Sequence, residues 1–182
     1  IKQPIVAAIG ANIPIGSPSG HMIVEIGGGT TEMAVISLGG IVASDSVRIG
    51  GVKFDAAIME HIRRMYNLAI GERTAEEIKI TVGSAMYLEE KLTMEVKGRD
   101  MITGLPKILE VSSDDVTQAI QPLLEGILTT MKEVLYKTPP ELSADVMDKG
   151  IVLSGGSSQL RNLDRLIAEA TGVPTYVAEE PQ

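Results

Sequence analysis

A run of three glycines is the part of the sequence best suited to hold a phosphate group. It lies in the segment Glu25-Ile-Gly-Gly-Gly-Thr-Thr-Glu32, directly after an apolar stretch typical of a buried strand. Consecutive glycines let backbone N–H groups point into one concavity, and the hydroxyls of Thr30 and Thr31 add donors. The same residues also suit an ordinary hairpin turn. The segment is neither a Walker A loop nor a Rossmann fingerprint, because a strand and not a helix follows it.

Two further glycine turns stand at expected strand ends. In Gly150-Ile-Val-Leu-Ser-Gly-Gly-Ser157 an apolar strand runs into Gly155 and Gly156 at an expected helix start, where free N–H groups and the helix dipole favour anions. Tight strand–helix packing would explain that turn alone equally well. The third turn is Arg48-Ile-Gly-Gly51. Because ligands of open α/β sheets bind at strand ends, the three turns together predict one shared crevice.

The composition limits the classes of function. The chain has 182 residues, of which 44% are hydrophobic and 22% charged, so it can build a core. Only 3% are aromatic, and the net charge is −8, which together disfavour nucleic-acid binding. The absence of cysteine excludes disulfides, thiolate catalysis and Cys-based zinc sites, and favours a reducing compartment. No apolar run approaches the length of a membrane span.

Patterning predicts mixed α and β elements around these turns. The triplet Gly27–Gly29 and the pair Gly39-Gly40 separate three expected strands at residues 22–26, 33–38 and 41–48. A helix follows Gly50-Gly51, with Asp55 as its expected cap, and a second helix begins at the capping-box pattern Thr74-x-x-Glu77. The opening stretch 1–11 is typical of the tail of a helix, so we expect a piece of a longer protein.

The second half of the chain continues the pattern. We expect a hairpin of strands 93–96 and 107–111, and then a long helix that begins at Ser112-x-x-Asp115 and is kinked at Pro122. Pro139-Pro140 ends this helix. A buried strand (151–153), the turn Ser154–Ser157, a helix that stops at Gly172 and a short strand (175–178) complete the order.

The residues closely resemble the MreB family, the bacterial actins that determine rod shape, including their MreB and Mbl paralogues. The resemblance runs from Gln3 to Pro181. It rests on the phrases I-G-G-G-T-T-E, I-G-E-R-T-A-E, T-P-P-E-L and L-R-N-L-D, which occur in the family's order.

The resemblance implies an α/β fold of the actin/Hsp70-like ATPase class, with an RNase H-like core and a smaller α+β subdomain. Residues 1–69 and 140–182 would form the core, and residues 70–139 the inserted subdomain. The chain would be the C-terminal half of the molecule. The first half, with its own phosphate loop, would be absent.

The resemblance also assigns site residues. Gly27, Gly28, Gly29 and Thr30 would hold the β- and γ-phosphates of ATP. Glu76 and Lys79, three apart on one helical face, would touch ribose and adenine; without the resemblance they would be taken as an exposed i,i+3 ion pair. The adenosine pocket would be lined by Gly155, Gly156 and Ser157, with Gly51 on its other wall.

Three residues depart from the family's pattern. Glu25 stands where the family has an Asp that acts on Mg²⁺, and its longer side chain alters the metal geometry. Gln3 replaces the Glu that positions the attacking water; a Gln can orient water but cannot accept its proton, so we expect slow hydrolysis, with Gln3 and Thr30 as the catalytic residues. Ser157 replaces a third glycine and would narrow the adenosine pocket.

The leading hypothesis is an ATP-binding cytoskeletal protein that polymerises and directs cell shape and cell-wall synthesis. The alternatives are a scaffold paralogue that has lost hydrolysis, and another ATPase of the superfamily, such as an Hsp70-like chaperone or a sugar kinase. By resemblance, its partners would be further copies of itself and membrane proteins such as RodZ and MreC. It would lie in the cytoplasm, at the inner face of the membrane through the missing half. By itself, the chain should fold but bind ATP weakly, hydrolyse none measurably and form no long filaments.

Overall fold

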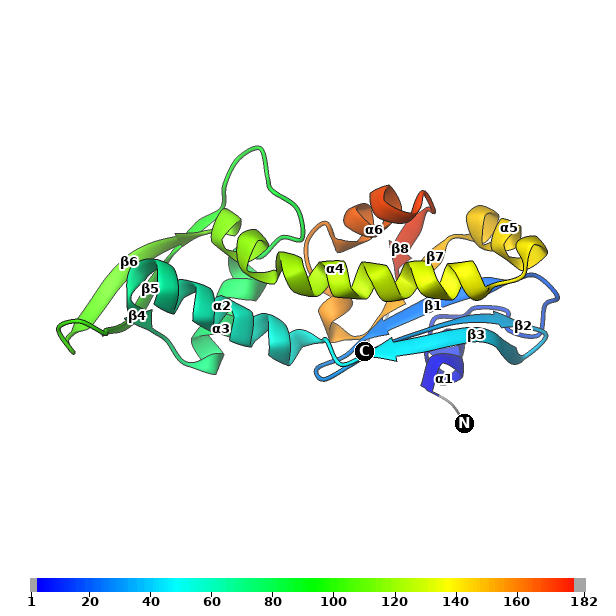
Figure 1. The fold of residues 1–182 in the computed structure, drawn as a ribbon, viewed down its shortest axis with the longest axis horizontal. Coiled ribbons are helices and arrows are strands. Elements are labelled where there is room, and N and C mark those ends of the chain that lie inside the picture. The colour runs from blue at the N-terminus through cyan, green and yellow to red at the C-terminus, as the bar shows by residue number, and fades with distance from the viewer. Residues whose placement is uncertain (1–2, 179–182) are drawn as a thin grey trace. The chain divides into compact units, whose positions relative to one another are not determined.

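The computed structural model describes residues 3–178, which divide into two compact units (Figure 1). The first unit contains residues up to Gly51, then 125–159, and then those from Leu163 onward. The second contains 52–124 and the three residues 160–162. These boundaries differ from the predicted ones at 69/70 and 139/140. The helix that follows Gly51 belongs to the second unit, where its His61 and Tyr66 contact Asp115.

The first unit is built on a five-stranded sheet in the order β3-β2-β1-β7-β8. Strands β1 (His21–Ile26), β2 (Thr31–Ser37) and β3 (Gly40–Val47) form an antiparallel meander. Strands β7 (Ile151–Ser154) and β8 (Thr175–Val177) add to β1 in parallel. An antiparallel opening followed by parallel strands is the RNase H-like topology, so the predicted fold class is confirmed.

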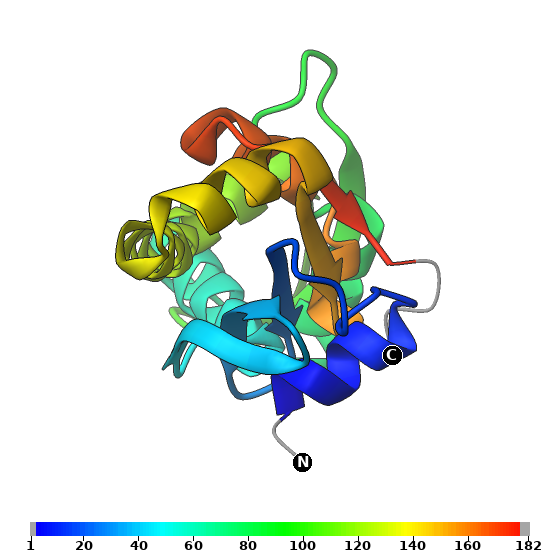
Figure 2. The ribbon, with the colours of Figure 1, turned by 90° about the vertical axis from the view of Figure 1, so that its right-hand side faces the viewer.

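Helices cover both faces of this sheet (Figure 2). On one face lies α1 (Gln3–Gly10), whose Ala8 packs against Ile23 of β1 and Ala34 and Ile36 of β2. On the other face lie α5 (Pro140–Lys149) and α6 (Leu163–Thr171), which contact β1 and β8. A sheet buried on both faces needs near-continuous apolar strands, and β1 and β2 have them.

The second unit combines helices with a small antiparallel sheet. The helices are α2 (Gly51–Tyr66), α3 (Glu72–Val82) and the first half of α4 (Ser113–Lys137). The sheet contains β4 (Leu68–Ala69), β5 (Thr93–Asp100) and β6 (Pro106–Ser112). The expected hairpin is present as β5–β6, with strands longer than predicted. The aliphatic core of the unit includes Ile58, Ile62, Ile78, Val111 and Ile120.

Two helix starts were predicted incorrectly. Asp55 was expected to cap α2, but α2 begins at Gly51 and Asp55 lies inside it. Helix α3 begins at Glu72 and not at the Thr74 capping box; its N-cap is Gly71, which makes no side-chain cap bond. In both cases a glycine turn, rather than a side-chain oxygen, sets the start of the helix.

The capping box of α4 is confirmed. The Ser112 N–H donates to Asp115 Oδ2 at 2.9 Å, and the Asp115 N–H donates to Ser112 Oγ at 3.4 Å. Pro122 lies within α4, which continues past it to Lys137. Helix α5 was not anticipated, although Pro140 at its first position is a favourable helix start. Among residues 3–178, no helix combines the length and the apolar character that crossing a membrane requires.

The β2–β3 hairpin gives a prediction about stability. Its turn residues Leu38 and Gly39 have φ angles of +51° and +74°, and Leu38 is 72% exposed. A leucine in the left-handed region costs about 1 kcal/mol relative to residues that tolerate it, such as asparagine. Leu38→Asn should therefore raise the free energy of unfolding by about 1 kcal/mol, measured by urea denaturation. Leu105→Asn, another exposed loop leucine, is the control; an equal gain there would contradict the backbone explanation.

Candidate phosphate- and nucleotide-binding site

The three glycine turns lie at one edge of the sheet. Strand β7 is parallel to β1, and β3 runs in the same direction as β1 because each is antiparallel to β2. The carboxyl ends of β1, β3 and β7 therefore meet at the same edge, and each leads directly into a glycine turn. This is the arrangement that the three turns predicted.

The first two turns are in direct contact. In the first, the Gly27 N–H donates to the Thr30 carbonyl at 2.9 Å, which closes the turn between β1 and β2. The Gly51 N–H, from the second turn, donates to the Gly27 carbonyl at 3.0 Å. A Cβ on Gly50 would lie 2.8 Å from the carbonyl carbon of Gly28, so only glycine allows this approach.

The third turn contacts the first as well. Ser157 Oγ donates to the Gly27 carbonyl at 3.3 Å. Gly155 has φ +88°, and a Cβ there would lie 2.8 Å from the carbonyl carbon of Ile26. The Gly27 carbonyl thus accepts hydrogen bonds from both other turns. The three turns form one interlocked group within the first unit.

Two glycines in this group are not explained by packing. A Cβ on Gly29 or on Gly156 would meet no heavy atom of the described protein within 4 Å. Neither residue has a φ in the left-handed region, so neither backbone requires glycine. Close approach to neighbouring backbone explains why Gly50 and Gly155 are glycines. It does not explain Gly29 and Gly156. The missing side chains leave open space beside the turns.

Two details of the predicted site are corrected. Thr31 was expected to offer its hydroxyl to phosphate, but it is fully buried and its Oγ1 donates to the Ile49 carbonyl at 2.7 Å. Thr30 remains exposed in the turn. The turn at Gly155 was expected to open an α-helix, but a short 3₁₀-helix, η1 (Gly156–Gln159), follows it and α6 begins only at Leu163. An extended helix dipole therefore does not act at this turn.

The carboxylate expected at the metal lies at the end of β1. Glu25 is half-buried, and its register partners are Glu32 on β2 and Ser154 on β7. Two carboxylates thus face each other across neighbouring strands next to the first glycine turn. Among residues 3–178, no group of three or more His, Cys, Asp or Glu residues could hold a metal ion by itself.

The remaining predicted residues lie as follows. Gln3 begins α1, but its side chain is outside the described part of the structure. Glu76 and Lys79 both lie on α3, in the second unit. Glu76 is exposed, whereas Lys79 is half-buried with its Nζ 2.8 Å from Asp55 Oδ1 on α2. Contact of either residue with a nucleotide stays a prediction.

A hollow of about 360 Å³ lies on the first unit beside α1, and Glu32, the register partner of Glu25, belongs to both places. Its lining includes Pro4, Glu32, Asp45 and Ser46. Two carboxylates disfavour an anionic ligand there. The glycine turns, which present backbone N–H groups, suit phosphate better than this hollow does.

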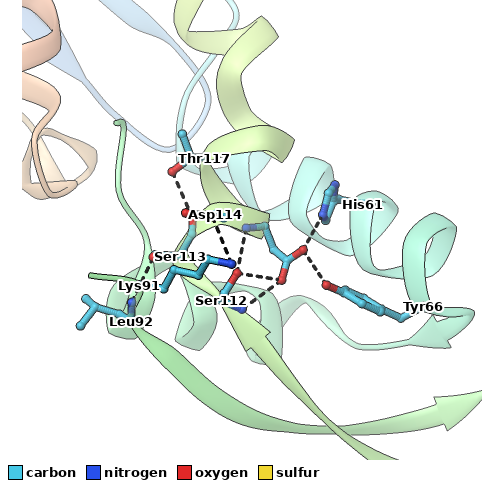
Figure 3. Close-up of polar contacts among 9 residues, drawn as sticks. His61, Tyr66, Lys91, Leu92, Ser112, Ser113, Asp114 and Thr117 are labelled. Carbon is cyan, nitrogen blue, oxygen red and sulfur yellow. Dashed lines mark hydrogen bonds and ion pairs between the residues drawn. The ribbon is translucent and has the colours of Figure 1, made fainter. Parts of the chain in front are cut away.

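Sequence reasoning missed a buried polar cluster in the second unit (Figure 3). His61 Nε2 on α2 lies 3.0 Å from Asp115 Oδ1 at the start of α4, and the Tyr66 hydroxyl donates to the same oxygen at 2.8 Å. Because His61 and Tyr66 are 54 and 49 positions from Asp115 in sequence, no local pattern indicates these contacts.

The cluster shifts two pKa values. Burial alone would raise the pKa of Asp115, but hydrogen bonds from the Ser112 N–H, His61 and Tyr66 outweigh it and hold the pKa below its usual value. Burial, followed by the hydrogen bond to Asp115, raises the pKa of Tyr66 to about 12. Both shifts favour the ionised carboxylate and the protonated hydroxyl. The cluster therefore stabilises the second unit rather than serving as an acid–base site.

Known proteins match the whole chain. The family model described as MreB/Mbl protein matches residues 1–182. The cell shape-determining protein MreB of Escherichia coli (strain K12) is 49% identical over 181 residues, covering 100% of this chain and 52% of that protein. The cell shape-determining protein Mbl of Bacillus subtilis (strain 168) is 48% identical over 180 residues, covering 99% and 54%. The chain thus spans about half the length of the curated relatives that it matches.

Solved structures agree with the fold. The crystal structure of MreB 5 of Spiroplasma citri bound to AMPPNP has a TM-score of 0.95 and 39% identity, covering 99% of this chain and 54% of that one. The MamK double helical filament has a TM-score of 0.79 at 22% identity, which shows a shared fold alone. From the family model and these relatives, the chain belongs to the MreB/Mbl family.

Proposed function

We propose that the chain is the nucleotide-binding C-terminal half of an actin-like protein that polymerises into filaments and directs cell shape. Membership of the MreB/Mbl family supports this proposal, as do relatives described as cell shape-determining proteins. Structures of the Spiroplasma citri relative carry AMPPNP and ADP, which supports ATP as the ligand. The alternative of a chaperone or sugar kinase is set aside, because the family model matches the entire chain.

The observation that carries the proposal is the open space at Gly29 and Gly156. In this proposal, the turn Gly27–Thr30 binds the β- and γ-phosphates through its backbone N–H groups other than that of Gly27, which donates to the Thr30 carbonyl. Gly51 and Gly155–Ser157 contact the adenosine portion. Glycine at 29 and 156 is explained if a ligand, rather than another part of the protein, occupies the space beside the turns.

The residues present fit a nucleotide-borne Mg²⁺ better than a protein-held one. Magnesium in phosphate sites takes one or two carboxylates and completes its shell with phosphate oxygens and water. Glu25, at the end of β1 beside the first turn, would supply such a carboxylate, with Glu32 opposite it. The ion would neutralise charge on the phosphates during hydrolysis. Thr30 and Gln3 would orient the attacking water, and neither can accept its proton.

A scaffold without hydrolysis is the second candidate. It is favoured by Gln3 and by the extra methylene at Glu25, both departures from the family's pattern. Measurement of phosphate release by the full-length protein under saturating Mg-ATP separates the two. Turnover above the spontaneous rate supports the ATPase, and nucleotide binding without turnover supports the scaffold. Both the ATPase and the scaffold would assemble into filaments with further copies. Both would contact RodZ- and MreC-like membrane proteins and lie in the cytoplasm at the membrane.

Two alanine substitutions test the glycine turns. Gly29→Ala and Gly156→Ala should each weaken Mg-ATP binding by the full-length protein at least about tenfold, because the new methyl group enters the space of the ligand. Their free energies of unfolding should stay within about 0.5 kcal/mol of the wild type, because no protein atom is displaced. Titration calorimetry and urea denaturation measure the two quantities.

Gly16→Ala is the matched control. A Cβ there also meets nothing within 4 Å, but Gly16 lies in the loop before β1, away from the turns. Gly16→Ala should change neither the affinity for Mg-ATP nor the free energy of unfolding. Unchanged ATP affinity in both site variants would contradict the proposed site.

A further inference from the structure

Three residues of the chain belong to a different unit from their neighbours. Leu160–Asn162 lie in the second unit, whereas η1 before them and α6 after them lie in the first. Arg161 is four residues past Ser157, the last residue of the third glycine turn. The segment therefore links a predicted adenosine-binding turn to the second unit through a short stretch of backbone.

This segment is fastened to the residues that follow α3. The Ala85 N–H donates to the Arg161 carbonyl at 2.8 Å, and Arg161 Nη1 donates to the Gly83 carbonyl at 3.0 Å. Asn162 Nδ2 donates to Ser84 Oγ at 3.3 Å. We call these five residues, Gly83–Ala85 with Arg161 and Asn162, the clasp. Two of its three bonds use side-chain donors, so a loop of other composition would not make them.

The clasp has a rigid anchor. Ser84 is fully buried, and its carbonyl accepts a hydrogen bond from Thr117 Oγ1 on α4 at 2.8 Å. Thr117 Oγ1 also lies 3.1 Å from the Ser113 carbonyl, one turn earlier in α4; both residues are labelled in Figure 3. At the other side, Gly83 ends α3 with its N–H on the Lys79 carbonyl at 3.0 Å. The residues that receive Arg161 and Asn162 are thus fixed by two helices.

The link from the clasp to the turn is also stiff. Ser158 is fully buried, and both its N–H and its Oγ donate to the Gly155 carbonyl, at 3.1 and 2.5 Å. Asn162 holds φ +64°, a left-handed conformation that asparagine tolerates better than most residues. The 3₁₀-helix η1 continues this bonded turn to Gln159, so Leu160 alone separates it from Arg161 of the clasp.

We propose that Arg161 and Asn162 are positioning residues, which hold the Gly155–Ser157 turn in the conformation that receives the adenosine portion of the nucleotide. The proposal rests on the proposed nucleotide site and adds the source of its adenosine specificity. Arg161 and Asn162 themselves do not touch the ligand. The phosphate turn Gly27–Thr30 carries none of the clasp bonds and meets the third turn through the Ser157 Oγ bond to the Gly27 carbonyl, so its affinity for phosphate should fall less than the affinity for adenosine.

The test compares two ligands on the full-length protein. The variant Arg161→Met/Asn162→Gly removes both side-chain donors, keeps the apolar stem at 161 and allows the backbone conformation at 162. Because the two lost bonds together contribute about 2 kcal/mol, affinity for Mg-ATP should fall by up to about thirtyfold. Affinity for inorganic tripolyphosphate, which has no adenosine, should stay within about twofold. Arg161→Lys, which retains a donor, should recover part of the ATP affinity.

The control and a second readout separate positioning from stability. Arg165→Met removes an exposed arginine on α6 that pairs with Glu169, and should change neither affinity. In the wild type, Mg-ATP should slow hydrogen exchange of the Ala85 amide, which bonds to Arg161; in the double variant this protection should be lost.

The outcomes are distinct. Equal losses for ATP and tripolyphosphate, or unchanged ATP affinity, overturn the positioning role while leaving the nucleotide site in place. Retained ATP protection of Ala85 in the double variant also overturns it. A wild-type protein that binds neither ligand overturns the proposed function and this proposal with it.

Discussion

Replacing Gly155 with alanine is expected to lower the free energy of unfolding by about 3 kcal/mol. Two costs combine: a non-glycine residue at φ +88° is strained, and the new Cβ would lie 2.8 Å from the Ile26 carbonyl carbon. That neighbour is backbone at the end of β1, in the centre of the sheet, and cannot rotate away. Urea denaturation of the chain, followed by circular dichroism, measures the loss.

Gly156→Ala is the matched control for this prediction. The two glycines are adjacent in the same turn, but a Cβ on Gly156 meets no protein atom within 4 Å. Its stability should stay within about 0.5 kcal/mol of the wild type, although its ATP affinity should fall. If both variants lost the same stability, the cost would come from turn flexibility in general and not from the contact with Ile26.

Replacing Asp115 with alanine should destabilise the second unit by about 3 kcal/mol. The carboxylate accepts hydrogen bonds from His61, Tyr66 and the Ser112 N–H, and all are lost together. His61 is only 2% exposed, and its Nδ1 has no hydrogen-bond partner among the described residues, so both ring nitrogens would then be buried and unsatisfied. Such groups cost more than the bond that they lose.

Asp114→Ala is the neighbouring control. Its carboxylate is 36% exposed and lies 3.6 Å from Lys91 Nζ, a surface pair of little energetic value. Its loss should change stability by less than about 0.5 kcal/mol. A similar effect of both substitutions would mean that charge at the start of α4, and not the His61–Tyr66 cluster, accounts for the stability.

The stability from Asp115 should also depend on pH in a stated direction. The pKa of this carboxyl is lower in the folded protein than its ordinary value of 3.8, so its contribution is complete above that value. It is lost as the pH falls through the lower folded-state pKa. The difference between wild type and Asp115→Ala should therefore shrink below about pH 4. At high pH, Tyr66 donates until its hydroxyl ionises, so its contribution is lost between pH 10 and about 12.

Much of the fold could be predicted because its signals are local. Runs of two or three glycines mark the ends of β1, β2 and β3, and the Ser112–Asp115 capping box marks the start of α4. The resemblance to the MreB family implied the RNase H-like sheet, and the order of these elements agrees with it. The position of the glycine turn between β1 and β2 could be predicted for the same reason, whereas its binding of phosphate stays a prediction.

The rest depends on contacts between residues far apart in sequence. Nothing near Thr31 indicates that its hydroxyl donates to Ile49, and nothing near Asp55 indicates that it pairs with Lys79 instead of capping a helix. The boundary of the second unit lies at Val52, earlier in the chain than the predicted subdomain boundary. Nothing local in α2 indicates its contacts with Asp115.

The path of the chain has a consequence for dissecting the molecule. Residues 52–124 look like a self-contained insertion that could be expressed separately or deleted. The second unit, however, also contains Arg161 and Asn162, which follow strand β7 of the first unit in the sequence. An excised 52–124 segment would leave Ala85 N–H and the Gly83 carbonyl without their partners and uncover a serine that is otherwise fully buried. Modular separation of this protein therefore requires grafting a three-residue peptide as well as cutting at the two obvious junctions.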